Sequence, residues 1–233
     1  MSTLLTDGHQ AKRQLDFLLA PLERRTIAWL VKRVPKRLAP DHLTAIGVAA
    51  ALGFAVCFAL SGALPALLWV GVGLLALNWF GDSLDGSLAR ARHIERPRYG
   101  YYLDHLVDAI STAAIAIGIG ASPYMMLPVG MAVGLIYLAL SINVYLEAQT
   151  RGQFKIGYGI FGPTEARIAL ASVTAALAAG VNFHISVLGQ TLQALDIVGI
   201  VMFVVMSLSL LVRAVGNLRA LAALEPPARP RVV

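Results

Sequence analysis

Four aspartates occur at helical spacing in a chain that is otherwise strongly apolar. They belong to two blocks separated by nine residues, Asp82-x-x-Asp85-Gly86-x-x-Ala89-Arg90 and Gly100-x-x-x-Asp104-x-x-x-Asp108. Because residues three or four apart share a face of a helix, each block would present two carboxylates beside small residues. Clustered carboxylates repel one another unless protons or cations neutralise them, and hard oxygen ligands suit Mg²⁺ or Mn²⁺. We therefore predict a site for two such ions at these carboxylates.

The small residues of the two blocks would leave room for a ligand to approach the helix backbone. A structural alternative is a set of helix-end carboxylates that pair with the many nearby arginines. Solvated helix ends, however, give no reason for the acids and the small residues to be in register. The spacing therefore favours a ligand site over surface ion pairs.

The composition predicts that helices in a membrane position these residues. Of the 233 residues, 58% are hydrophobic and 14% are charged, and the mean hydropathy is +0.71. This is too apolar for a soluble domain. Apolar runs of about 20 residues are long enough to cross a bilayer as helices. We expect six of them, near residues 43–62, 64–88, 101–121, 124–147, 164–184 and 193–216.

The predicted fold is all-α, an integral membrane bundle of six transmembrane helices with an N-terminal amphipathic interfacial helix. Residues 16–38 mix apolar and basic side chains in the pattern of a helix that lies on the inner leaflet. We expect residues 1–42 to form a cytoplasmic N-terminus that contains this helix. The six-helix domain would then comprise residues 43–222, and residues 223–233 would be a disordered cytoplasmic tail.

The distribution of basic residues predicts the orientation. Eight Lys and Arg lie in residues 12–37, four in 90–98, three in 151–167 and four in 213–231, which together are all 19. The positive-inside rule therefore places both termini and the acidic blocks on the cytoplasmic side, and we expect a bacterial inner membrane protein. The net charge of +6 does not call for a nucleic acid partner, because basic residues at a membrane edge attract anionic lipid headgroups.

The two acidic blocks resemble the motif of the CDP-alcohol phosphotransferase family, membrane enzymes that make phospholipids by exchanging an alcohol for CMP. All eight motif positions are filled. The resemblance implies a transferase for substituted phosphate groups that releases CMP, uses Mg²⁺ or Mn²⁺ and forms a homodimer. Its partners would be a CDP-linked alcohol, an acceptor alcohol and membrane lipid.

The resemblance also implies roles for individual residues. Asp108 would be the catalytic base and also a metal ligand. The other metal ligands would be Asp82, Asp85 and Asp104. The residues that contact the CDP group would be Asp82, Gly86, Ala89, Arg90 and Gly100.

Two further segments resemble the branch that contains choline and ethanolamine phosphotransferases. They are Leu103-Asp104-His105-x-x-Asp108-Ala109 and Gly162-Pro163-Thr164-Glu165-Ala166-Arg167. Candidate residues for an acceptor or headgroup site are His105, Glu147, Glu165 and Arg167. The alternatives are a packing histidine at 105 and an ordinary helix start, in which Pro163 and Glu165 occupy the first turn.

Two substrate arrangements stay open: a CDP-aminoalcohol with diacylglycerol, or CDP-diacylglycerol with a small alcohol. A competing function is a divalent metal-ion transporter, whose acids would lie near the midplane of several helices. A scaffold with a degenerate motif would tolerate the loss of metal ligands, and here none is missing.

Overall fold

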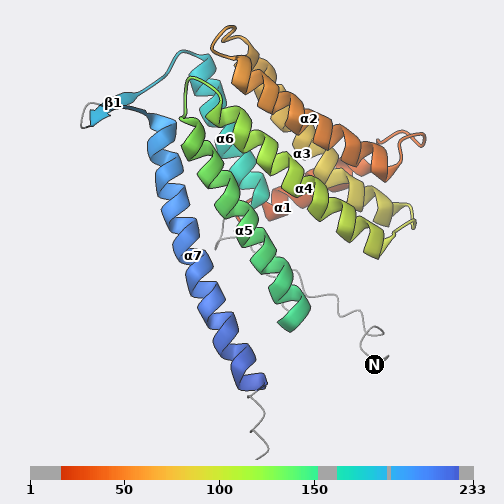
Figure 1. The fold of residues 1–233 in the computed structure, drawn as a ribbon. Coiled ribbons are helices and arrows are strands. Elements are labelled where there is room, and N and C mark those ends of the chain that lie inside the picture. The colour runs from red at the N-terminus through yellow and green to blue at the C-terminus, as the bar shows by residue number, and fades with distance from the viewer. Residues whose placement is uncertain (1–16, 152–161, 188–189, 226–233) are drawn as a thin grey trace, which may run out of the picture.

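The computed structural model describes residues 17–151, 162–187 and 190–225, which form helices and one short hairpin (Figure 1). The described helices are α1 (Ala20–Val31), α2 (Pro40–Leu60), α3 (Leu67–Ala91), α4 (Pro97–Gly120), α5 (Leu127–Arg151), α6 (Pro163–Ala178) and α7 (Ala194–Leu224). Strands β1 (His184–Val187) and β2 (Gln190–Gln193) pair in antiparallel fashion, with His184 opposite Gln193. Proline stands at the first position of α2, α4 and α6, where its fixed φ angle suits a helix start and no intrahelical N–H is lost.

Five of these helices are long and apolar enough to cross a membrane, namely α2, α3, α4, α5 and α7. Five helices of this length and composition are the pattern of a multi-pass integral membrane protein. The helix expected at 164–184 is shorter than predicted: α6 has 16 residues and ends at Ala178. At 1.5 Å per residue it is about 24 Å long, below the roughly 30 Å of a hydrocarbon core. The prediction of six spans is thus supported for five helices, and the sixth stays a prediction.

The all-α prediction did not include the hairpin between α6 and α7. After the hairpin, α7 continues to Leu224, past the expected end of the span at 216. The start of α7 is fixed by Asp196, which is fully buried and accepts hydrogen bonds from two backbone N–H groups, Gln193 N at 2.9 Å and Met126 N at 2.6 Å. One carboxylate thus caps α7 and ties it to the α4–α5 connection.

Within the stretch 16–38 the structure has the helix α1, which is 12 residues long, and its position at the membrane interface stays a prediction. The linker that follows is held by Arg92, whose guanidinium donates hydrogen bonds to three backbone carbonyls, Leu38 O at 2.5 Å, Pro35 O at 3.0 Å and Val34 O at 3.3 Å. Residues 1–16 of the expected N-terminus and 226–233 of the expected tail lie outside the described residues.

Helix α2 packs against both helices that carry the acidic blocks, α3 and α4. Close approach depends on small residues: a Cβ on Gly81 of α3 would lie 2.5 Å from Leu43 O, and one on Gly118 of α4 would lie 2.5 Å from the backbone of Ala55. Asn78 adds a buried hydrogen bond from its Nδ2 to Gly47 O at 2.9 Å. Glycine contacts therefore set how closely α3 and α4 approach α2.

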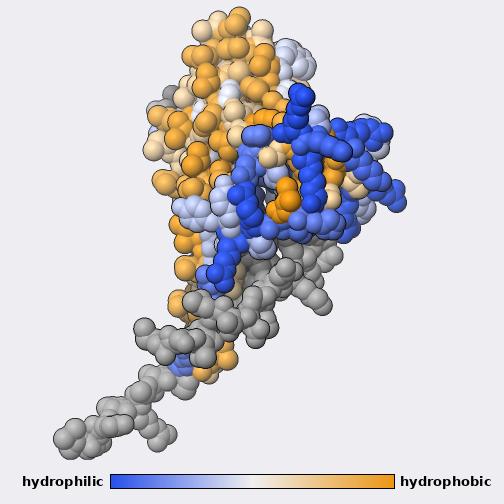
Figure 2. Space-filling view, turned by 90° about the vertical axis from the view of Figure 1, so that its right-hand side faces the viewer, coloured by the Kyte–Doolittle hydropathy of each residue, from blue (hydrophilic) through white to orange (hydrophobic). Residues whose placement is uncertain are grey.

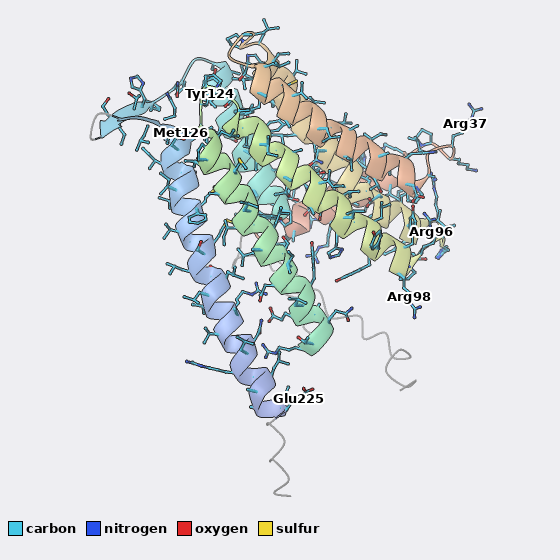
Figure 3. All side chains as sticks on the ribbon, viewed as in Figure 1. Arg37, Arg96, Arg98, Tyr124, Met126 and Glu225 are labelled. Atoms are coloured by element: carbon cyan, nitrogen blue, oxygen red, sulfur yellow. The ribbon has the colours of Figure 1, made fainter. Side chains whose placement is uncertain are left out.

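The surface divides into a polar and an apolar region. In the space-filling view, hydrophilic side chains gather on one part of the face and apolar side chains cover the adjoining surface (Figure 2). Arg37, Arg96 and Arg98 lie together at the end of the bundle opposite Tyr124 and Met126 (Figure 3). This is the pattern of a membrane protein with one strongly basic edge.

Candidate metal and nucleotide site

Three of the four motif aspartates come together between α3 and α4. One carboxylate oxygen from each of Asp82, Asp104 and Asp108 lies within 4.8 Å of the others. Asp104 and Asp108 are one turn apart on α4, so they share a face, and Asp82 approaches from α3. None of the three is fully buried, so water and a charged ligand can reach them.

Asp85 is not a member of this three-carboxylate group. Its Oδ2 accepts a hydrogen bond of 2.6 Å from Thr44 Oγ1 of α2, and its Oδ1 accepts one of 2.5 Å from Gly86 N. The carboxylate is thereby held toward α2. The prediction that Asp85 is a metal ligand stays a prediction, and Thr44 is the side chain that orients it.

A positive charge from a third helix reaches the cluster. Arg167 of α6 forms an ion pair with Asp82, with 2.6 Å between Nη2 and Oδ2. The two side chains are 21% and 24% exposed, so this pair is only partly screened by solvent. Of the four candidate acceptor residues, Arg167 is the one that directly contacts a motif aspartate among the contacts described.

The motif glycines face open space. A Cβ at Gly100 would meet nothing within 4 Å, and one at Gly86 would meet only the guanidinium of Arg90, at 3.4 Å. These glycines therefore differ from Gly81 and Gly118, which backbone contacts require to be small. Packing among the described residues does not explain Gly86 or Gly100, whereas a ligand that lies against α3 and α4 would.

Arg90 extends from the last turn of α3 and is exposed. Its Nη2 donates a hydrogen bond of 3.0 Å to Ser87 Oγ. The contact keeps the guanidinium beside Gly86, on the open side of the helix. A phosphate above Gly86 would therefore find a cation within reach.

His105 is packed in an aromatic group. Its ring centroid lies 4.0 Å from that of Tyr101 and 4.4 Å from that of Tyr145 on α5, and its Nδ1 is 2.6 Å from Tyr101 O. The sequence left both a packing role and an acceptor-site role open for this residue. These contacts support the packing role.

Glu147 belongs to a second polar group, which joins α5 to α7. Arg213 pairs with its carboxylate at 2.6 Å and Arg151 at 3.8 Å, while Arg151 also donates to Asn217 Oδ1 at 2.5 Å. Glu147 is buried, and an unpaired charge there would be costly. The observed partners give it a structural role between two spanning helices.

Glu165 supports the start of α6. Its Oε2 accepts a hydrogen bond of 3.0 Å from Gly162 N, and its Oε1 accepts one of 2.7 Å from Leu19 N, at the start of α1. Sequence reasoning foresaw the first half of this arrangement, an acid in the first turn of a helix. The bond to Leu19 could not be foreseen, because it joins residues 146 positions apart.

Two acids that were not among the predicted site residues also join separate elements. Asp41 of α2 accepts two hydrogen bonds of 2.6 Å from Arg96, which precedes α4, and this bonding raises the pKa of Arg96. Glu23 of α1 accepts hydrogen bonds from α3 and α6. The signal available in the sequence was that Glu23 is one of only two acids, with Asp16, in a predicted interfacial stretch rich in arginine and lysine.

Comparison with known proteins assigns the chain to a family. The model of the CDP-alcohol phosphatidyltransferase family matches residues 37–215, and the chain belongs to this family. It is 34% identical over 131 residues to the archaetidylinositol phosphate synthase of Methanothermobacter thermautotrophicus, covering 55% of this chain and 60% of that protein. It is 29% identical over 190 residues to cholinephosphotransferase 1 of Danio rerio, covering 74% of this chain and 48% of that protein. The chain thus spans about half to three fifths of the length of these relatives.

The family uses divalent metals, and the residues present fit such an ion. Three carboxylates within 4.8 Å are the hard, anionic donors that Mg²⁺ or Mn²⁺ requires, and the adjoining glycines leave space for a phosphate ligand of the metal. The donors lie on two separate helices, so their spacing depends on how α3 and α4 pack against α2.

Proposed function

We propose that the protein is a membrane enzyme of phospholipid synthesis that transfers a substituted phosphate group from a CDP-alcohol to an acceptor hydroxyl. In the reaction, the acceptor oxygen attacks the β-phosphorus and forms a new P–O bond. The bond between that phosphorus and the bridging oxygen of the diphosphate breaks, and CMP leaves. The hydroxyl proton passes to a base.

Asp108 is the proposed base, as well as a metal ligand. Asp82, Asp85 and Asp104 are the other proposed ligands. When bound, a pair of divalent ions would neutralise the diphosphate and stabilise the charge on the leaving phosphate. The CDP group would lie on the open side of α3 and α4, beside Asp82 and Arg90. There it would contact the small residues of the motif, Gly86, Ala89 and Gly100.

One observation carries this proposal beyond the family assignment. Asp82, Asp104 and Asp108 converge beside Gly86 and Gly100, which no contact in the part of the chain described here requires to be small. Arg167 offsets part of the negative charge of this cluster through its ion pair with Asp82. An anionic substrate with a metal ion would satisfy both the acids and the open space.

The substrate arrangement follows from neither relative alone. One relative is named as an archaetidylinositol phosphate synthase and the other as a cholinephosphotransferase. Arg167 is the acceptor-site residue we retain, because it lies at the acidic cluster. The resemblance of the segments around His105 and Glu165 to the aminoalcohol branch favours a CDP-aminoalcohol with diacylglycerol, although both segments have structural roles that would account for them.

We further propose that both termini and the site face the cytoplasm of a bacterial inner membrane, and that the protein acts as a homodimer. The charge distribution along the chain supports the orientation. The homodimer rests on the family resemblance alone. If α6 is a sixth crossing, the C-terminal end of α7 lies on the same side of the membrane as the start of α2.

Release of CMP by the purified protein with Mg²⁺ or Mn²⁺ tests the proposal. CDP-diacylglycerol would be offered with a panel of alcohols that includes inositol phosphate, and CDP-choline or CDP-ethanolamine would be offered with diacylglycerol. One pair should release CMP, and Asp108→Asn should abolish that release. The proposal fails if no pair yields CMP while Asp108→Asn behaves like the wild type in vivo.

The transporter alternative makes a different prediction, namely uptake of divalent ions into sealed vesicles without any nucleotide. No contact described for the site favours it over the transferase. The match to a transferase family over residues 37–215 favours the transferase.

A further inference from the structure

Glu23 of α1 joins three helices through one carboxylate oxygen. Its Oε1 accepts hydrogen bonds from Thr164 Oγ1 of α6 at 2.6 Å, from Trp79 Nε1 of α3 at 3.2 Å and from Ser83 Oγ of α3 at 3.4 Å. Figure 1 shows α1 lying beside these helices. An acid with three donors from two other helices is not a solvated surface charge, because each donor fixes its position.

A second set of contacts joins α1 to α6. Leu19 N donates a 2.7 Å hydrogen bond to Glu165 Oε1, and Phe17 packs so closely on Gly162 that a Cβ there would lie 2.6 Å from its ring. The start of α6 is therefore built against the start of α1. Helix α1 is therefore packed against the other helices.

The donors to Glu23 are close in sequence to the two residues of the Arg167–Asp82 ion pair. Trp79 and Ser83 lie on either side of Asp82 along α3, and Thr164 lies one turn before Arg167 on α6. Helices α3 and α6 are thus joined twice at this level, once by the Arg167–Asp82 ion pair and once through Glu23. A change in the second connection would move the two partners of the first.

We propose that Glu23 is a positioning residue, which holds α6 against α3 so that Arg167 reaches Asp82 at the metal site. The proposal rests on the proposed function for its effect on catalysis, but not for its effect on cation binding. Because an error of about 1 Å in the placement of reacting groups can cost about a hundredfold in rate, loss of the Glu23 hydrogen bonds should lower kcat roughly ten- to a hundredfold.

The variants are chosen to separate hydrogen bonding from charge. Glu23→Gln keeps an acceptor oxygen and removes the charge, whereas Glu23→Ala removes both. Thr164→Val removes only the shortest of the three bonds and nearly preserves shape, so it serves if Glu23→Ala does not fold. Glu95→Ala is the matched control, since Glu95 is an exposed acid in the α3–α4 connection.

Two measurements on the full chain in lipid nanodiscs test the proposal. In CMP release, Glu23→Gln and Glu95→Ala should stay within about threefold of the wild type, while Glu23→Ala should lose kcat without a matching rise in KM. If the wild type itself releases no CMP, the proposed function fails. The Mn²⁺ measurement alone then tests whether Glu23 positions Arg167.

The second measurement is a double-mutant cycle in Mn²⁺ affinity, read by electron paramagnetic resonance without nucleotide. Glu23→Ala should bind Mn²⁺ more tightly than Glu23→Gln, because Arg167 no longer competes for Asp82. Adding Arg167→Ala should remove that difference. Equal affinities for the two Glu23 variants, or effects that add independently of Arg167, would overturn the proposal.

Discussion

Arg167 occupies a carboxylate oxygen that a divalent cation would use, so the two should compete for Asp82. Replacing Arg167 by alanine removes the competitor. We expect Mn²⁺ to bind the Arg167→Ala variant more tightly than the wild type, even though a contact at the site has been lost. The direction follows from charge alone, because a guanidinium beside the cluster repels a second cation.

The magnitude follows from the geometry of the pair. A charge-assisted hydrogen bond at 2.6 Å contributes about 1.5 to 3 kcal/mol when shielded. Both side chains are about a fifth to a quarter exposed, which reduces this to about 1 to 2 kcal/mol. The Kd for Mn²⁺ should therefore fall roughly five- to thirtyfold.

Titration of the purified protein with Mn²⁺ measures this directly, with Arg98→Ala as the control. Arg98 is an exposed arginine in the first turn of α4, so its removal changes the net charge equally. Arg167→Lys keeps the charge and should bind Mn²⁺ much like the wild type. If Arg167→Ala binds Mn²⁺ no more tightly than Arg98→Ala, Arg167 and Mn²⁺ do not compete for Asp82.

Three further predictions concern the base, the glycines and the second polar group. Asp108→Asn should lower kcat for CMP release by about 10² to 10⁴, the usual contribution of general base catalysis, and an unchanged kcat would exclude this base. Gly81→Ala should destabilise the protein by about 1 to 3 kcal/mol in thermal unfolding, whereas Gly86→Ala should leave stability unchanged and raise the KM for the CDP-alcohol. Equal stabilities of the two variants would contradict the view that Gly81 serves packing and Gly86 serves the ligand. Glu147→Ala should lower thermal stability by about 2 to 4 kcal/mol because the ion pair with Arg213 is lost, and Arg213→Ala in the same chain should restore part of it.

The sequence predicted the motif helices well because two kinds of information coincide there. Apolar length defines α2, α3, α4 and α5, and aspartates four residues apart must share a face of α4. The approach of Asp82 to that face was not contained in the spacing. It depends on backbone contacts such as those of Gly81, which are visible only after the helices have packed.

The shortfalls have physical reasons as well. The apolar residues after 178 look like part of a span in the sequence. In the structure, α6 ends at Ala178, and the backbone turns away from the helix at Gly180, where φ is +83°. Such a positive φ favours glycine and ends a helix. The contacts of Glu147 with Arg213 and of Glu165 with the backbone N–H of Leu19 could not be predicted from local pattern, because each joins segments far apart in the sequence; the acceptor-site roles of these two acids stay predictions.

The length of α6 has a consequence for the lipid around it. If α6 makes the proposed sixth crossing, its 16 residues are about 6 Å shorter than the hydrocarbon layer, so the bilayer beside it would thin or polar groups would enter it. Arg167 lies in the second turn of this helix, on the side of the acidic cluster. We expect a local depression of the membrane surface beside Arg167. There the phosphate group of a lipid could reach ions in water while its acyl chains remain in the hydrocarbon core.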